Sequence, residues 1–205
     1  MLRRRRDSTE QRFVDRVLDE CREVGISIRT VPGRWINEGD LQHRGTYSDE
    51  KMVLSVARDS PQWFETLIHE YCHMQQHLEG MDWFQPGATS AWNRYYAWCT
   101  QSAKWRESLI LDTRFIQLCE LDAERRALAI MRRYRFPTID IDEYARGANS
   151  YVYEHEAQRL VRNVSLRRPE KVQAIRPLLS TRLIKDHQVG LLPNGFLDLY
   201  IRHCV

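Results

Sequence analysis

Two histidines and a glutamate in the segment 66–74 have the types and the spacing needed to bind a metal ion and to move a proton beside it. The segment reads Thr-Leu-Ile-His-Glu-Tyr-Cys-His-Met, so His69 and His73 are four residues apart and Glu70 lies between them. On a helix, residues four apart lie one above the other on the same face. Both imidazoles could then bind one zinc ion, with the Glu70 carboxylate next to it. The alternative is a polar helix face with two ordinary histidines.

A catalytic zinc ion normally takes three protein ligands and keeps a fourth position for water, so two histidines are not sufficient. His77 extends the pattern by four more residues. At about 1.5 Å rise per residue, however, it lies roughly 12 Å along the helix from His69. Zinc–nitrogen bonds of about 2 Å cannot span that distance. We therefore expect His77 to lie on the wall of a cleft or on the surface.

Glu120 and Glu124 are better candidates for the third ligand, because both lie on an otherwise apolar helix face. That face also carries Ile116, Ala123, Ala127, Met131 and Tyr134. An unpaired buried carboxylate is very costly, and a zinc ion with a bound histidine would compensate both groups. Either glutamate could reach the ion. The alternative is that both pair with arginines at a helix edge, and Asp112 and His155 are the next candidates for a ligand.

At this point the chain resembles a known group of enzymes. The pattern His69-Glu70-x-x-His73, followed by Glu120-x-x-x-Glu124 on a second helix, resembles the gluzincin branch of zinc metallopeptidases. The run 120–128 is also similar in style to the ligand helix of compact intracellular ImmA/IrrE-type peptidases. The resemblance implies a zincin-like fold and zinc-dependent cleavage of peptide bonds in a peptide or protein substrate.

The resemblance also implies a role for each residue of the two motifs. Zinc would be bound by His69, His73 and Glu120, and Glu70 would act as the general base. Glu124 would accept the outer N–H of a ligand histidine and fix its orientation.

Two further features are expected around such a site. The strand 51–57 resembles the edge strand on which these enzymes lay an extended substrate. A residue that stabilises the oxyanion is less obvious, and the candidates are Tyr151, Tyr153 and His155.

The helix that carries the first motif must position these groups. Ser60 and Pro61 predict its start, as a cap and a first helical residue, and Gly80 predicts its end. On a helical wheel its apolar side chains fall on one broad side: Phe64, Leu67, Ile68, Tyr71, Cys72, Met74 and Leu78. The motif residues fall on the other side, which we expect to face a cleft.

Periodicity and turn residues predict the other elements. Before the motif helix we expect a helix over 8–24, a strand over 26–31, a turn at 32–33, a loop over 37–40, and strands over 44–48 and 51–57. After it we expect an aromatic-rich helix over 88–111, a helix over 112–134, a helix over 142–164 with a candidate interruption at 147–149, and a tail of short helices and turns. The pattern indicates an α+β fold, with a small three-strand sheet packed on a mostly helical domain.

The aromatic-rich segment is expected to be a packed helix, although a platform that stacks on a ligand is an alternative. One side of it would carry Trp92, Tyr95, Tyr96, Cys99 and Ala103, and Trp98 and Trp105 would face elsewhere.

Composition limits the class of protein. The chain has 205 residues, and 42% are hydrophobic and 29% charged, which is typical of one globular domain over 1–205 with a flexible basic tail at 1–7. It contains neither an apolar run long enough for a membrane span nor the apolar core of a signal peptide. Five cysteines without paired spacing indicate free thiols in a reducing compartment, so we expect a cytoplasmic protein.

The basic residues raise a second class of partner. The formal net charge is +3, and 27 of the 31 basic residues are arginine. Arginine suits phosphate recognition, so a regulatory or DNA-associated zinc protein with weak or no peptidase activity is the alternative function. A peptide substrate is favoured over nucleic acid.

Overall fold

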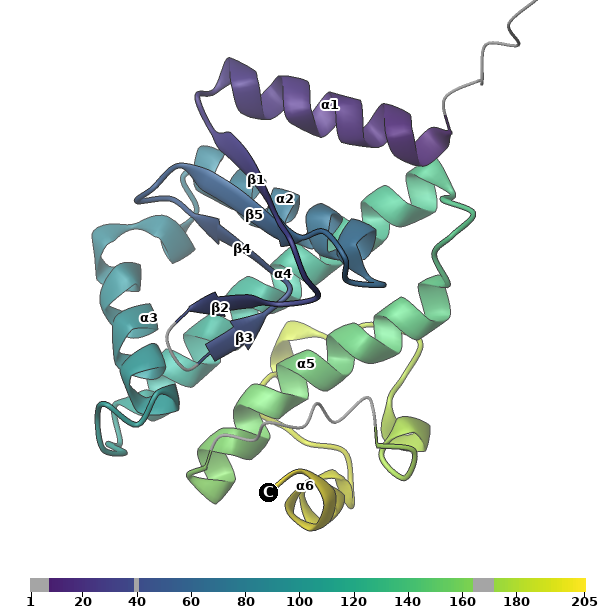
Figure 1. The fold of residues 1–205 in the computed structure, drawn as a ribbon. Coiled ribbons are helices and arrows are strands. Elements are labelled where there is room, and N and C mark those ends of the chain that lie inside the picture. The colour runs from purple at the N-terminus through teal and green to yellow at the C-terminus, as the bar shows by residue number, and fades with distance from the viewer. Residues whose placement is uncertain (1–7, 39–40, 164–171) are drawn as a thin grey trace, which may run out of the picture.

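The computed structural model describes residues 8–38, 41–163 and 172–205, and in these residues the chain forms six α-helices and five β-strands. The fold is α+β and mostly helical, with one three-stranded sheet and one two-stranded sheet (Figure 1). This confirms the expected class of fold. The expected basic tail at 1–7 lies outside the described residues.

The chain begins with helix α1 (Thr9–Glu23), as its caps and apolar spacing predict. Ser8 caps it, because its Oγ accepts a hydrogen bond from the backbone N–H of Gln11. Phe13, Val17 and Cys21 bury one stripe of the helix against the sheet and α2.

The three-stranded sheet contains β1 (Ser27–Val31), β4 (Gly45–Ser48) and β5 (Val53–Ala57), in the order β1-β5-β4. β5 pairs in parallel with β1 and antiparallel with β4. The expectation that the strand over 51–57 is an edge strand is therefore wrong, since β5 is the central strand. Most of β5 is buried, which is typical of a strand with neighbours on both sides. The edge strand nearest the motif helix is β4.

A hairpin of β2 (Ile36–Glu38) and β3 (Leu41–His43) replaces part of the loop expected over 37–40. The side chains of Asn37 and Gln42 are exposed and hydrogen-bonded across the pair, with Gln42 Nε2 donating to Asn37 Oδ1 at 3.1 Å. Polar, exposed strands lack the alternation of apolar residues that would have predicted them.

Helix α2 (Trp63–Leu78) carries the His-Glu-x-x-His motif and begins slightly later than expected. Ser60 and Pro61 lie in the turn before it, where Ser60 Oγ accepts from the backbone N–H of Gln62. The helix ends as predicted, with Gly80 at a φ of +68°. The predicted apolar side is buried except for Leu78.

The opposite side of α2 is also buried, which corrects the expectation that it faces an open cleft. Glu70 and His73 are 7% and 8% exposed. This face packs against helix α4 (Leu109–Tyr134), the long helix that crosses the molecule beneath α2 (Figure 1). The motif residues therefore lie in a layer between two helices.

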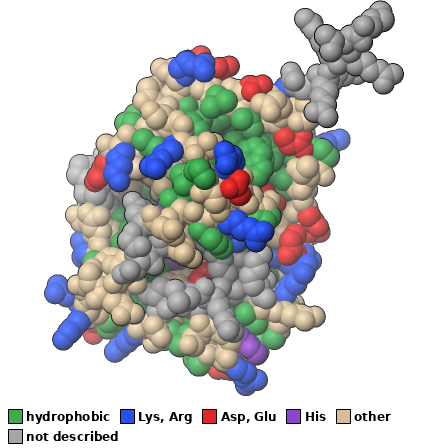
Figure 2. All heavy atoms as spheres, viewed as in Figure 1, with side chains coloured by type: hydrophobic (Ala, Val, Ile, Leu, Met, Phe, Trp, Pro, Cys, Tyr) green, Lys and Arg blue, Asp and Glu red, His purple; other side chains and the backbone are tan. Residues whose placement is uncertain are grey.

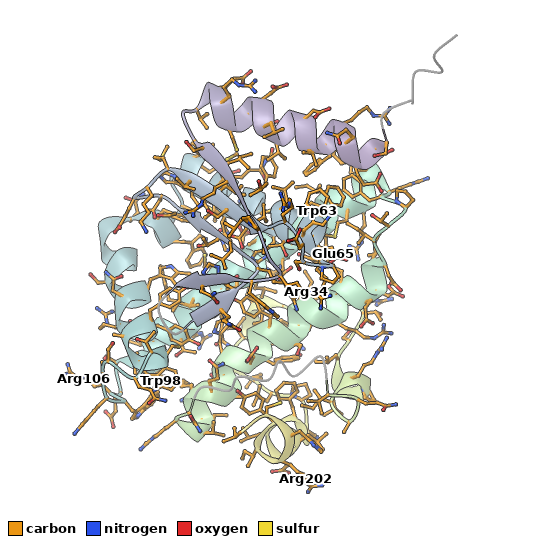
Figure 3. All side chains as sticks on the ribbon, viewed as in Figure 1. Arg34, Trp63, Glu65, Trp98, Arg106 and Arg202 are labelled. Carbon is orange, nitrogen blue, oxygen red and sulfur yellow. The ribbon has the colours of Figure 1, made fainter. Side chains whose placement is uncertain are left out.

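The aromatic-rich segment is not one helix. Helix α3 (Pro86–Cys99) ends where the chain turns, and α4 begins at Leu109. Trp98, labelled in Figure 3, lies three residues after Tyr95 in α3 and is buried, contrary to expectation. Its ring meets that of Trp105 edge to face. Tyr96 and Ala103 are exposed instead.

The C-terminal half packs on the other side of α4. Helix α5 (Ile141–Val161) is capped by Asp140 and continues through Gly147 without the expected interruption. Three short 3-10 helices, η1 (Asp82–Phe84), η3 (Arg176–Leu178) and η4 (Asp186–Gln188), and the last helix α6 (Phe196–Cys204) complete the described fold. None of the helices in the described part of the chain has a stretch that is apolar and long enough to cross a bilayer. All five cysteines are free thiols.

Candidate metal centre

The structure brings His69 and His73 of α2 together with Glu120 of α4. The Nε2 atoms of the two histidines are 3.1 Å apart, and Glu120 Oε2 lies 3.3 Å from each of them. Among the described residues, these three form the group of His, Cys, Asp or Glu side chains that could hold a metal ion.

The geometry of the three donor atoms fits a tetrahedral zinc ion. With zinc–ligand bonds of about 2.0 to 2.1 Å, tetrahedral ligand atoms are about 3.3 Å apart. The observed separations of 3.1, 3.3 and 3.3 Å are close to that value. Glu120 Oε2 is buried and has no hydrogen-bond partner. A buried carboxylate oxygen without a donor is costly, and a cation at the centre of the three atoms would satisfy it.

The second glutamate, Glu124, lies on the outer side of His69. Its Oε1 is 3.3 Å from His69 Nδ1, and its Oε2 accepts a hydrogen bond from the hydroxyl of Tyr144 on α5 at 2.5 Å. This is the position expected for a group that orients a ligand histidine. Glu120 thus contacts the two histidines, and Glu124 contacts His69 and Tyr144. These partners differ from the arginines of the alternative interpretation.

Sequence reasoning missed both Tyr144 and Gln76. Tyr144 holds Glu124, and Gln76 contacts His73, with its Oε1 2.8 Å from His73 Nδ1. Gln76 follows His73 by three residues on the same helix face, and this spacing could have identified it. Tyr144 comes from another helix, and nothing in its local sequence indicates the contact.

The buried carboxylates make the site electrostatically negative. Burial lowers the pKa of His69, but Glu124 and Glu120 outweigh burial and raise the pKa of His69 to about 10. The pKa of His73 is also raised well above its ordinary value, since Glu120 outweighs the effect of burial. Burial raises the pKa of Glu120, but the two histidines reverse this and lower it. The same negative potential would attract a divalent cation.

Glu70 lies beside this group, against the edge strand β4. Burial raises the pKa of its carboxyl group. A Cβ atom added at Gly45 would lie 2.8 Å from Glu70 Cγ and 3.0 Å from its Oε1, and closer still to Thr66 Cγ2. Only a glycine allows β4 to approach α2 this closely. Gly45 is a third residue of the site that the local sequence did not indicate.

Asp112 and His155, the next candidates for a ligand, lie outside the group of three, and so does His77. Asp112 accepts two hydrogen bonds from Arg94, at 2.8 and 2.6 Å. His77 is hydrogen-bonded through Nδ1 to the hydroxyl of Tyr47 at 2.5 Å and lies outside the group of three, as expected.

The three candidates for stabilising an oxyanion separate in space. The ring centroids of Tyr151 and His69 are 6.5 Å apart, and the two rings meet edge to face. His155 is hydrogen-bonded through Nδ1 to the hydroxyl of Tyr95 at 2.6 Å. Tyr153 packs on Phe196 in the C-terminal core. Tyr151 is therefore the candidate that contacts a residue of the site.

Comparisons with protein-family models, with curated proteins and with solved structures find no match to this chain, so the function must be inferred from the geometry of the site itself.

Proposed function

We propose that the protein is a zinc-dependent hydrolase of zincin type that cleaves peptide bonds. Zinc would be held by His69 and His73 through Nε2 and by Glu120 through Oε2. The observation that carries the proposal is the tetrahedral spacing of these three atoms, together with the buried Glu120 oxygen that has no hydrogen-bond partner.

Zinc bound there would lower the pKa of a water molecule and polarise a carbonyl group. The residues of the chain supply the remaining chemistry. Glu70 follows His69 directly and is positioned to take a proton from the attacking water and pass it to the leaving amine. Tyr151, whose ring lies edge to face with that of His69, would donate a hydrogen bond to the developing oxyanion.

The edge strand β4 suits the binding of an extended peptide. Within the three-stranded sheet β4 pairs with β5 along one side. Its first residue, Gly45, lies against Glu70. A peptide that pairs backbone to backbone with β4 would pass close to the general base. We therefore expect the substrate to bind along β4, and not along the strand expected from the sequence.

The alternative of a DNA-associated protein is less well supported. Nucleic-acid binding needs a basic stripe or patch. On the face in Figure 2, lysine and arginine side chains are spread among aspartate and glutamate side chains. Binding to DNA that weakens steeply with salt would favour this alternative.

The test compares Glu70→Gln with the wild-type protein. We expect about one zinc per chain in both, and hydrolysis of a peptide mixture only by the wild type, because a carboxamide cannot accept the proton. Glu23→Gln, an exposed residue at the end of α1, serves as the matched control and should keep full activity. Loss of zinc in Glu70→Gln, or full activity in that variant, would contradict the proposal.

A further inference from the structure

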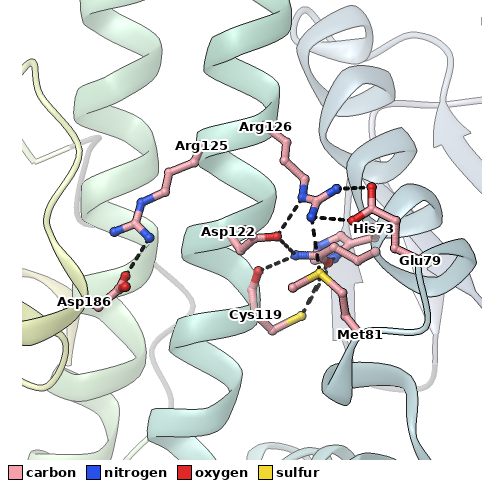
Figure 4. A network of polar contacts seen from close by, with 9 residues as sticks. His73, Glu79, Met81, Cys119, Asp122, Arg125, Arg126 and Asp186 are labelled. Atoms are coloured by element: carbon pink, nitrogen blue, oxygen red, sulfur yellow. Dashed lines mark hydrogen bonds and ion pairs between the residues drawn. The ribbon is translucent and has the colours of Figure 1, made fainter.

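The side chain of Gln76 is completely buried between α2 and α4 and makes four polar contacts, one of which is a weak hydrogen bond that its Oε1 accepts from the thiol of Cys119 at 3.6 Å. Its Nε2 donates to the backbone carbonyl oxygen of Cys119 at 3.0 Å and to Asp122 Oδ2 at 2.9 Å. Its Oε1 lies 2.8 Å from His73 Nδ1. Figure 4 shows this network, which connects a histidine of the metal centre to the surface of α4.

The chemistry of the partners determines which way the amide of Gln76 points. A carbonyl oxygen and a carboxylate oxygen can only accept, so the NH₂ group must face Cys119 and Asp122. The amide oxygen is then directed at His73. Because that oxygen can only accept, His73 must donate from Nδ1. In the neutral ring that binds a metal, the lone pair is then on Nε2, the atom that faces Glu120 Oε2 and His69 Nε2.

Asp122 is itself fixed by an arginine that joins the two helices. Arg126 Nε donates to Asp122 Oδ2 at 2.7 Å, and its two terminal nitrogens donate to the carboxylate of Glu79 at 2.7 and 2.8 Å. Glu79 caps the end of α2, whereas Asp122 and Arg126 belong to α4. The acceptors that orient the amide are therefore anchored to both helices (Figure 4).

We propose that Gln76 is the positioning residue of His73: its amide, oriented by Asp122 and the carbonyl of Cys119, keeps the proton on Nδ1 and presents Nε2 to the metal. This inference rests on the proposed zinc site, and it adds a second orienting partner beside Glu124. Each ligand histidine would then have its own partner, Glu124 for His69 and Gln76 for His73.

The first test measures zinc affinity by competition with a chromophoric chelator. Gln76→Met keeps the length of the side chain but removes the amide, and we expect zinc affinity to fall about 10- to 100-fold. Gln75→Met is the matched control, because Gln75 is the neighbouring residue of α2 and its amide donates to the hydroxyl of Tyr71, not to a histidine. Its affinity should equal that of the wild type. The visible spectrum of the cobalt-loaded protein should change in Gln76→Met alone.

The second test is a double-mutant cycle with Asp122→Ala. Asp122 accepts hydrogen bonds from both Gln76 and Arg126, and the proposal predicts that its effect on the metal passes through Gln76. We expect Asp122→Ala to weaken zinc binding several-fold in the wild-type background and to have no further effect in Gln76→Met. A general electrostatic or structural effect of Asp122 would be equal in both backgrounds, and that result would overturn the proposed orientation of the amide. If Gln76→Met does not fold, the more exposed Asp122→Ala decides the question, and wild-type affinity in that variant would overturn the inference.

The outcomes separate this inference from the proposed function. Tight zinc binding by the wild type and by Gln76→Met would overturn the role of Gln76 and leave the hydrolase proposal intact. Weakened binding by Gln76→Met in a protein that cleaves no peptide would support the role of Gln76 and contradict the hydrolase proposal. A wild-type protein that binds neither zinc nor cobalt would overturn both.

Discussion

Replacing Gly45 with alanine tests how closely the edge strand β4 approaches the motif helix. The added Cβ would lie 2.8 Å from Glu70 Cγ, whereas ordinary contacts of a Cβ begin at 3.4 Å. It would meet the methyl group of Thr66 at a still shorter distance. Gly45 has no positive φ, so backbone strain does not contribute and the whole effect comes from these contacts.

The magnitude follows from the two groups that must move. Overpacking of this kind costs about 1 to 3 kcal/mol of unfolding free energy. Part of the movement falls on Glu70, and a displacement of about 1 Å at a reacting group costs about 100-fold in rate. We expect Gly45→Ala to keep its zinc, because the Cβ meets neither histidine, and to lose most of its activity.

The assay combines urea unfolding, zinc content and peptide hydrolysis. Adding Thr66→Ser removes the methyl group but keeps the hydroxyl that donates to the carbonyl of Gln62. Gly45→Ala with Thr66→Ser should therefore regain much of the stability while activity stays low. Gly147→Ala is the matched control, because nothing lies within 4 Å of the added Cβ and α5 should gain about 0.5 to 1 kcal/mol. Wild-type stability and activity in Gly45→Ala would refute the close approach of β4 to α2.

Two further predictions concern the carboxylates and the pH range. Glu120→Ala should purify without zinc, whereas Glu124→Ala should keep part of its zinc with affinity reduced about 10- to 100-fold; metal analysis of both variants checks this, and the reverse order would make Glu124 the ligand. Burial raises the pKa of Tyr47 to about 12, so the folded state holds this proton more tightly than the unfolded state. Its contribution to stability is complete below the unfolded pKa of about 10 and is lost as pH rises through the folded value. Urea unfolding across this range should show that loss in the wild type and less of it in Tyr47→Phe; equal losses would exclude Tyr47 as the cause.

The parts of the site that could be predicted from the sequence are those fixed by one helix. The spacing of His69 and His73 places both on one face of α2, whatever that helix packs against. Glu120 and Glu124 stand out because two carboxylates interrupt an apolar face of α4. In the structure the two polar stripes face each other, so the buried histidines of α2 and the buried glutamates of α4 pair with one another.

The parts that could not be predicted depend on contacts between distant segments. The order of the strands is one example. β5 returns to pair in parallel with β1, and β4 is left at the edge of the sheet. Local alternation of residues is the same for a central and an edge strand of this length. The contact of Tyr144 with Glu124 is another example, because it depends on how α5 lies on α4.

The relative position of α2 and α4 controls the geometry of the candidate metal centre, because two donors come from one helix and the third from the other. Gln76 and the ion pair between Arg126 and Glu79 join the two helices at one end of this contact. Tyr144 adds a contact from α5 through Glu124. A shift of one helix would therefore change the distance from Glu120 to both histidines and disturb the contacts of their Nδ1 atoms with Glu124 and Gln76. Substitutions in the contact between α2 and α4, even of residues that touch no metal ligand, should consequently change zinc affinity. The change should be larger than for substitutions of exposed residues at the same distance from the site.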